Sequence, residues 1–153
     1  MNVRAAIGIA GLVLLGACSA PNARWLRSVE EAQRAADAAR VEGDLEAARE
    51  HLLPVADGEG VQDSNGSGVR ALRQDAHYQI ARLALELDDG AGALRHADAG
   101  IALGGGDLYE ANLWIVRGQA NEHLGRDDVA GSDYHRALLL NDAMLGAMLD
   151  DAP

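Results

Sequence analysis

The chain has 153 residues, a formal net charge of −11 and one cysteine. This length suits one domain with its own hydrophobic core. The excess of carboxylates excludes nucleic acid as a partner, because binding to its phosphate backbone requires basic patches. A single cysteine also excludes an intrachain disulfide, so we expect stability to come from packing alone.

The first predicted element is a short secretory signal at residues 1–17. One positive charge, Arg4, precedes an uncharged apolar stretch that is shorter than the about 20 residues a membrane-spanning helix needs. The stretch ends in Leu-Gly-Ala-Cys, residues 15–18, which resembles the bacterial lipobox. That resemblance implies cleavage before Cys18 and acylation of its new N-terminus. A plain secreted protein and an uncleaved anchor are the alternatives.

The residue after the cysteine bears on localisation. Ser19 stands where an aspartate would resemble an inner-membrane retention signal. The resemblance therefore implies a protein anchored by lipid in the bacterial outer membrane and facing the periplasm. Residues 18–27 are then the lipidated N-terminus and a linker. Several acyl chains anchor a protein stably, whereas one chain holds it only marginally.

From residue 28 to residue 150 the apolar residues recur with a helical period, and we predict one helical domain. Ser28 and Glu31 form a predicted capping box at its start. Pro54 is expected to end the second helix, and a Gly/Ser-rich stretch at 57–68 is expected to be a loop. The predicted helices cover residues 28–42, 44–54, 69–87, 90–103, 108–124 and 127–140, followed by a short apolar segment to Leu149.

These helices come in consecutive pairs, which is typical of a repeat architecture. The third pair reads Trp114-x2-Arg117-Gly118-x2-Asn121, then Ala130-x3-Tyr134, which resembles the tetratricopeptide repeat. Weaker matches begin at His77 in the second pair and at Ala32 in the first. The resemblance implies an all-α fold, an antiparallel helix-pair solenoid of about three repeats with a C-terminal capping helix.

Small residues recur where the two helices of a pair should approach closely. On the first helices they are Ala36, Ala81 and Gly118, and on the second helices Ala48, Ala93 and Ala130. Glycine inside a helix costs about 1 kcal/mol relative to alanine. We therefore expect Gly118 to lie in a close helix contact that requires it.

The C-terminal segment carries an apolar face made of Met144, Leu145, Met148 and Leu149. A capping turn packed on the last pair is the plainer interpretation. An exposed methionine-rich contact site is the alternative, because methionine suits adaptable binding surfaces.

Residues for catalysis or metal binding do not form a recognisable pattern. The histidines, His51, His77, His96, His123 and His135, lack the spacing of paired metal ligands. His77 occupies the position of Trp114 in the repeat, so we expect it to pack in the core. We predict no cofactor, no metal and no enzymatic activity, and an enzyme with a site built by the stacked helices is the rival hypothesis.

The family resemblance implies a concave groove lined by the first helix of each pair, which in such proteins holds a peptide or a partner helix. The positions that map onto it are Gln33, Asp37, Arg40, Tyr78, Arg82, Leu85, Asn112, Ile115, Gln119 and Glu122. Amides can bond a peptide backbone, and Arg82 can bind a carboxylate.

The expected function is that of a non-catalytic adaptor for an envelope protein or peptide. By the resemblance it would act in assembling an outer-membrane complex of the pilus, secretion or polysaccharide-export type. The alternatives are a regulator of periplasmic cell-wall hydrolases or proteases and a passive structural lipoprotein. A homo-oligomer is also possible, because three thin repeats can be completed by a second copy.

Overall fold

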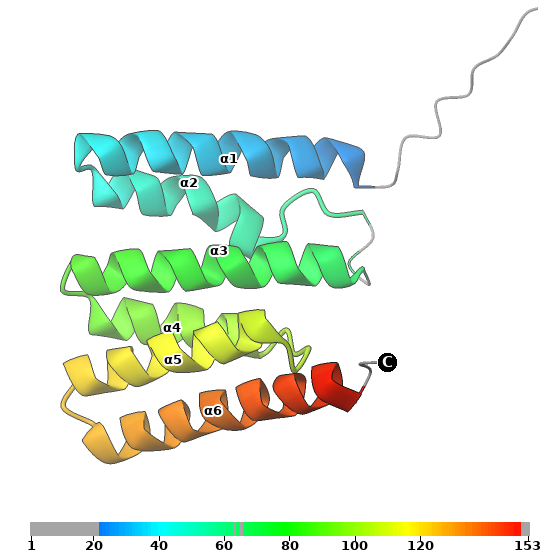
Figure 1. Cartoon of the computed structure of the whole chain (residues 1–153). Coiled ribbons are helices and arrows are strands. Elements are labelled where there is room, and N and C mark those ends of the chain that lie inside the picture. Colours follow the sequence, from blue (N-terminus) through cyan, green and yellow to red (C-terminus); the bar gives the residue numbers. More distant parts are fainter. Residues whose placement is uncertain (1–21, 63, 65, 151–153) are drawn as a thin grey trace, which may run out of the picture.

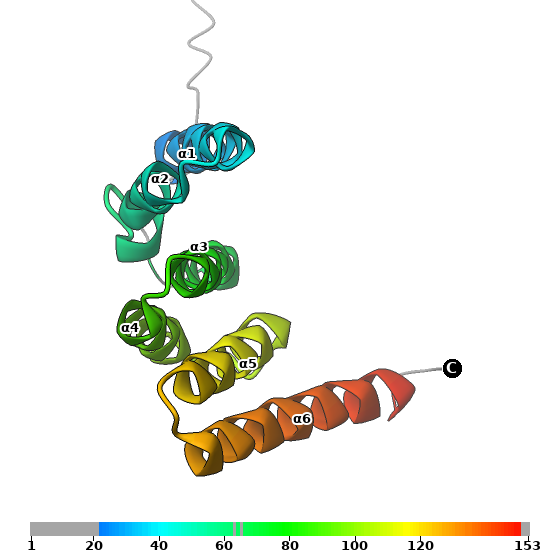
Figure 2. The ribbon, with the colours of Figure 1, turned by 90° about the vertical axis from the view of Figure 1, so that its left-hand side faces the viewer.

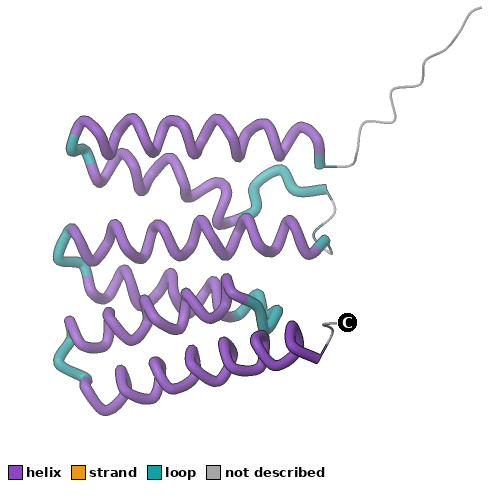
Figure 3. Tube along the Cα trace, in the orientation of Figure 1, coloured by secondary structure: helices purple, strands orange, loops and turns teal. Residues whose placement is uncertain are grey.

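The computed structural model describes residues 22–62, 64 and 66–150, and within them the fold is all-α, with helices in antiparallel pairs (Figures 1 and 3). The helices are α1 (Ala23–Glu42), α2 (Leu45–Asp57), α3 (Ser67–Glu86), α4 (Gly90–Ile101), α5 (Leu108–His123) and α6 (Asp127–Asp150). The predicted all-α helix-pair fold is confirmed. The signal segment 1–17 and Cys18 lie outside the described residues.

Each helix packs against the next along the chain, and the pairs stack into a curved array. Seen along the helices, α1 and α3 lie on one side of the stack, and α2 and α4 lie on the other (Figure 2). In addition to these sequential contacts, α3 packs directly on α5. No contact of comparable size joins α1 to α3 among the described residues. The first pair is therefore set apart from the second on the side of the first helices.

The predicted linker at residues 18–27 is too long by its last five residues, since α1 begins at Ala23. The reason is burial, because Trp25 and Val29 are only 3% and 4% exposed and belong to the N-terminal core. Ser28 consequently lies inside the helix, where its hydroxyl donates to the carbonyl of Trp25 at 2.7 Å, instead of capping it.

Three predicted helix starts are confirmed by capping bonds. Asp44, Asp89 and Asp107 each accept a hydrogen bond from a backbone amide three residues ahead, at 2.9, 2.7 and 3.2 Å. These carboxylates satisfy amides that have no partner within their helices. Pro54 does not end α2 as predicted, because the helix continues to Asp57 around it.

The predicted small-residue contacts are buried in the structure. All five alanines of that set are at most 1% exposed. A β-carbon on Gly118 would lie 2.5 Å from the ring of Tyr134 on α6, so only glycine admits this approach of α5 to α6. Larger side chains fill the N-terminal half of the core, notably Leu52, Ile80 and Leu83.

The C-terminal apolar segment is a direct continuation of α6, which runs for 24 residues against 16 for α5. Met144 is half-buried, whereas Leu145, Met148 and Leu149 are 57%, 73% and 67% exposed. The C-terminal half of α6 projects beyond α5, as its red end in Figure 2 shows. Most of the predicted cap is therefore not packed on the last helix pair.

Candidate concave binding surface

The ten predicted groove residues lie on α1, α3 and α5, and none of them is buried. Those on α1 are Gln33, Asp37 and Arg40; those on α3 are Tyr78, Arg82 and Leu85; those on α5 are Asn112, Ile115, Gln119 and Glu122. Five are exposed and five are half-buried. All ten side chains are therefore accessible to a binding partner.

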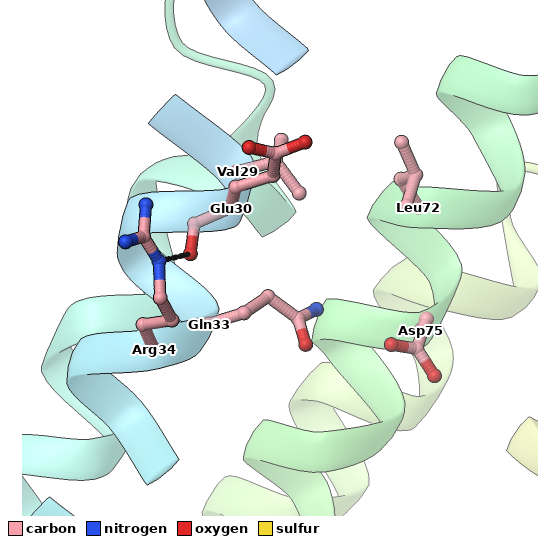
Figure 4. Close-up of a pocket in the computed structure, with 6 residues that line it drawn as sticks. All are labelled: Val29, Glu30, Gln33, Arg34, Leu72 and Asp75. Carbon is pink, nitrogen blue, oxygen red and sulfur yellow. Dashed lines mark hydrogen bonds between the residues drawn. The ribbon is translucent and has the colours of Figure 1, made fainter. Parts of the chain in front are cut away.

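A pocket of about 520 Å³ opens between α1 and α3, where the two helices lack a close contact. Val29 and Leu72 supply apolar walls from the two helices (Figure 4). The rest of the lining is polar and consists of Glu30, Gln33, Arg34 and Asp75. An apolar hollow with a few polar groups around it is the usual form of a binding site in proteins.

The polar side chains of the pocket keep hydrogen-bonding capacity for a ligand. Arg34 Nε donates to the backbone carbonyl of Glu30 at 3.3 Å, which leaves the carboxylate of Glu30 outside this bond (Figure 4). Asp75 accepts from the amide of Gln79 at 2.6 Å. Neither carboxylate forms an ion pair within the described part of the chain. A cationic or amide group can therefore bind here without displacing a salt bridge.

The middle of the surface is formed by α3. The guanidinium of Arg82 lies 5.9 Å from the centre of the Tyr78 ring, a cation–π arrangement that holds both side chains along the helix. Tyr78 and Leu85 pack against a small alanine-rich core cluster. Each of these two side chains thus has an anchored apolar part and a face accessible to solvent.

On α5 the surface meets α6. Glu122 accepts a hydrogen bond from the hydroxyl of Tyr134 at 2.7 Å. Burial and this carboxylate raise the pKa of Tyr134 to about 12. Glu122 therefore helps to hold α6 against α5. The side chains of Asn112, Ile115 and Gln119 form no hydrogen bond to α6 within the described residues.

Of the six residues that line the pocket, the sequence analysis predicted only Gln33 as a binding residue and missed the other five. Glu30 and Asp75 lie one helical turn before the predicted positions Gln33 and Tyr78, on the same helix faces. That i−3 spacing is a signal that could have found them. The contribution of Leu72 depends on how far apart α1 and α3 lie, which no local pattern reveals.

Two of the histidines, the buried His77 and the half-buried His96, lie side by side. Nδ1 of His77 lies 3.3 Å from Nδ1 of His96, and His77 is 5% exposed, as expected for a packing residue. Burial, the other histidine and Arg73 lower the pKa of His77 to about 4. Within the described residues there is no group of three or more side chains that could hold a metal ion.

No protein-family model matches the sequence, and none of the curated proteins is significantly similar to it. Among the described residues, no helix is both long enough and apolar enough to cross a lipid bilayer.

Proposed function

We propose that this protein is a non-catalytic adaptor whose concave surface binds a peptide segment of a partner protein. The observation that carries the proposal is the pocket between α1 and α3, which combines apolar walls with two carboxylates that form no ion pair among the described residues. One large apolar side chain of the peptide would enter between Val29 and Leu72. Gln33 would bond the peptide backbone, and the anchored Tyr78–Arg82 pair would continue the surface.

The proposal includes a lipid anchor at Cys18 and a tetratricopeptide-like origin of the helix pairs. Both are supported by the sequence motifs, and the structure adds a distance limit. Since α1 starts at Ala23, the chain from Cys18 to Asn22 spans at most about 14 Å. An anchored domain would therefore stay close to the periplasmic face of the outer membrane, where it could recruit components of a pilus, secretion or export complex.

The anchor has a direct test. Cys18→Ala is expected to accumulate as unprocessed precursor and to lose partitioning into the detergent phase. Ser19→Asp is the companion variant, and it is expected to move the processed protein to the inner membrane. Unchanged detergent partitioning of Cys18→Ala would refute lipidation at this residue.

The pocket is tested by panning a random peptide library on the mature chain, residues 18–153, and measuring the selected peptides by fluorescence anisotropy. Gln33→Trp places a large ring in the pocket and should weaken binding by at least about tenfold. Gln33 is only half-buried, so the helix should fold unchanged, which circular dichroism checks. His51→Trp places the same ring at an exposed position on α2, outside the pocket, and is the control that should bind like the parent. Equal affinity for Gln33→Trp would remove the pocket from the proposal.

A further inference from the structure

The C-terminal half of α6 carries an unusual share of the exposed apolar side chains. Of ten large exposed hydrophobic residues in the described chain, five lie between positions 138 and 149. They are Leu138, Leu139, Leu145, Met148 and Leu149. Clusters of this kind on a soluble surface mark interaction sites more often than isolated apolar residues do.

The fold indicates which kind of element covers such a surface. The second helices α2 and α4 are each packed against the first helix of the following pair, α3 and α5. No helix follows α6 among the described residues. The side of α6 that faces away from α5 thus corresponds to the sides of α2 and α4 that contact the next helix. A further helix packed there would continue the same arrangement.

Helical geometry places the exposed leucines together. Leu138, Leu145 and Leu149 follow the spacing i, i+7, i+11 and form one stripe. The side of α6 against α5 is different, since it buries Ala130 and Ala137. An amphipathic helix with apolar residues every three or four positions matches the leucine stripe.

The charges around the stripe indicate which kind of partner could bind there. Asp142 lies on the same face, four residues after Leu138, Asp150 follows Leu149, and no basic residue of the described chain follows Arg136. A second copy would add its own Asp142 and Asp150 to this face and no cation, and each chain already carries a net charge of −11. An anionic lipid surface would be repelled in the same way. A helix with lysine or arginine beside its apolar stripe has the complementary charge.

We propose that the C-terminal half of α6 is a docking site for a cationic amphipathic helix of a partner protein. This site is separate from the pocket between α1 and α3 and does not depend on peptide binding there. It would let the protein hold two partners, or two segments of one partner, at the same time.

The test uses the mature chain and a synthetic lysine–leucine peptide whose leucines follow helical i, i+3, i+4, i+7 spacing. Binding is measured by fluorescence anisotropy, and the helicity of the peptide by circular dichroism. The parent should bind the peptide and induce its helix, and Leu145→Asp/Leu149→Asp should weaken binding by at least about tenfold. The two new carboxylates would strengthen a purely electrostatic attraction, so weaker binding identifies apolar docking. Both leucines are more than half exposed, so the variant should fold.

Matched variants separate this site from others. Val41→Asp adds one such carboxylate at a 90% exposed apolar residue on α1 and should leave peptide binding unchanged, as should Gln33→Trp in the pocket. The proposal is overturned if Leu145→Asp/Leu149→Asp binds like the parent, or if only Gln33→Trp loses binding. It is also overturned if light scattering shows a dimer of the parent that the double variant abolishes, because a second copy would then cover the stripe.

Discussion

The two ends of the helix stack are held together by different chemistry. At the N-terminal end, large apolar side chains such as Trp25, Leu52 and Ile80 fill the space between α1, α2 and α3. On α6, the buried residues are the small Ala130 and Ala137 and the polar Asp133, which is bonded to polar side chains of α5. The same antiparallel pairing is thus reached with an apolar core at one end and a hydrogen-bonded one at the other.

The polar contact is built around Asp133, whose side chain is 3% exposed. It accepts hydrogen bonds from Asn121 at 2.8 Å and from Arg117, both on α5. Arg117 also binds Asp98 on α4 at 2.6 Å and lies 5.3 Å from the centre of the Trp114 ring. Arg117 and Asn121 together satisfy one buried carboxylate. Small residues are required where the backbones of two paired helices approach closely. At the other core positions, a helix pair can be held by apolar side chains or by hydrogen-bonded polar ones.

The largest expected effect comes from breaking the polar end. Arg117→Met should lower the free energy of unfolding by about 3–5 kcal/mol, because it leaves the carboxylate of Asp133 buried without its cation. Chemical denaturation measures this value. The double variant Arg117→Met/Asp133→Leu should recover much of the loss, since an apolar contact of similar volume then replaces the ion pair. If Arg117→Met alone is neutral, the buried network does not hold α6 in place.

The next effect tests the boundary between the two ends, where His77 on α3 contacts His96 on α4. Burial is the main cause that lowers the pKa of both histidines, and Asp57 opposes it in each case. Because the folded pKa of His77 is about 4 against 6.5 unfolded, the unfolded state binds more protons between these values. Stability should be complete above pH 6.5 and decline as the pH falls toward 4, by about 2 kcal/mol from pH 7 to 4.5.

Thermal melts across that pH range provide the measurement. His77→Gln should flatten the dependence on pH, whereas the exposed His51→Gln should retain the slope of the parent. A parent whose melting temperature stays constant from pH 7 to 4.5 would contradict the lowered pKa of His77.

The features that the sequence predicted are those set by neighbouring residues. Asp44, Asp89 and Asp107 cap helices by accepting from backbone amides three residues away. Each capping aspartate and its amide therefore lie within one short segment of the sequence. The start of α1 was mispredicted for the opposite reason. Asn22 accepts a hydrogen bond from the amide of Gln62, 40 residues later, and Trp25 is buried by other helices, so neither contact is visible locally.

The same distinction applies to the candidate site. The ten predicted residues came from the tetratricopeptide resemblance, and all ten lie at accessible positions of α1, α3 and α5. The pocket depends on the separation of α1 from α3. That separation is a property of the packing, because α3 packs on α5 but not comparably on α1. The exposure of α6 beyond α5 likewise follows from the relative lengths of two packed helices.

The smallest expected effect compares two glycines at the polar end. Gly118 faces the Tyr134 ring, whose hydroxyl is held by Glu122, so Gly118→Ala should force the helices apart and cost about 1–2 kcal/mol. Gly131 on α6 has no atom within 4 Å of its would-be β-carbon. Gly131→Ala should instead stabilise the protein by about 0.5–1 kcal/mol, since alanine is the better helix former. Chemical denaturation of both variants measures the difference, and equal effects would show that close approach does not distinguish the two positions. Opposite signs would establish that the α5–α6 contact requires glycine only where an aromatic ring meets the backbone, even though hydrogen bonds supply much of the rest of that interface.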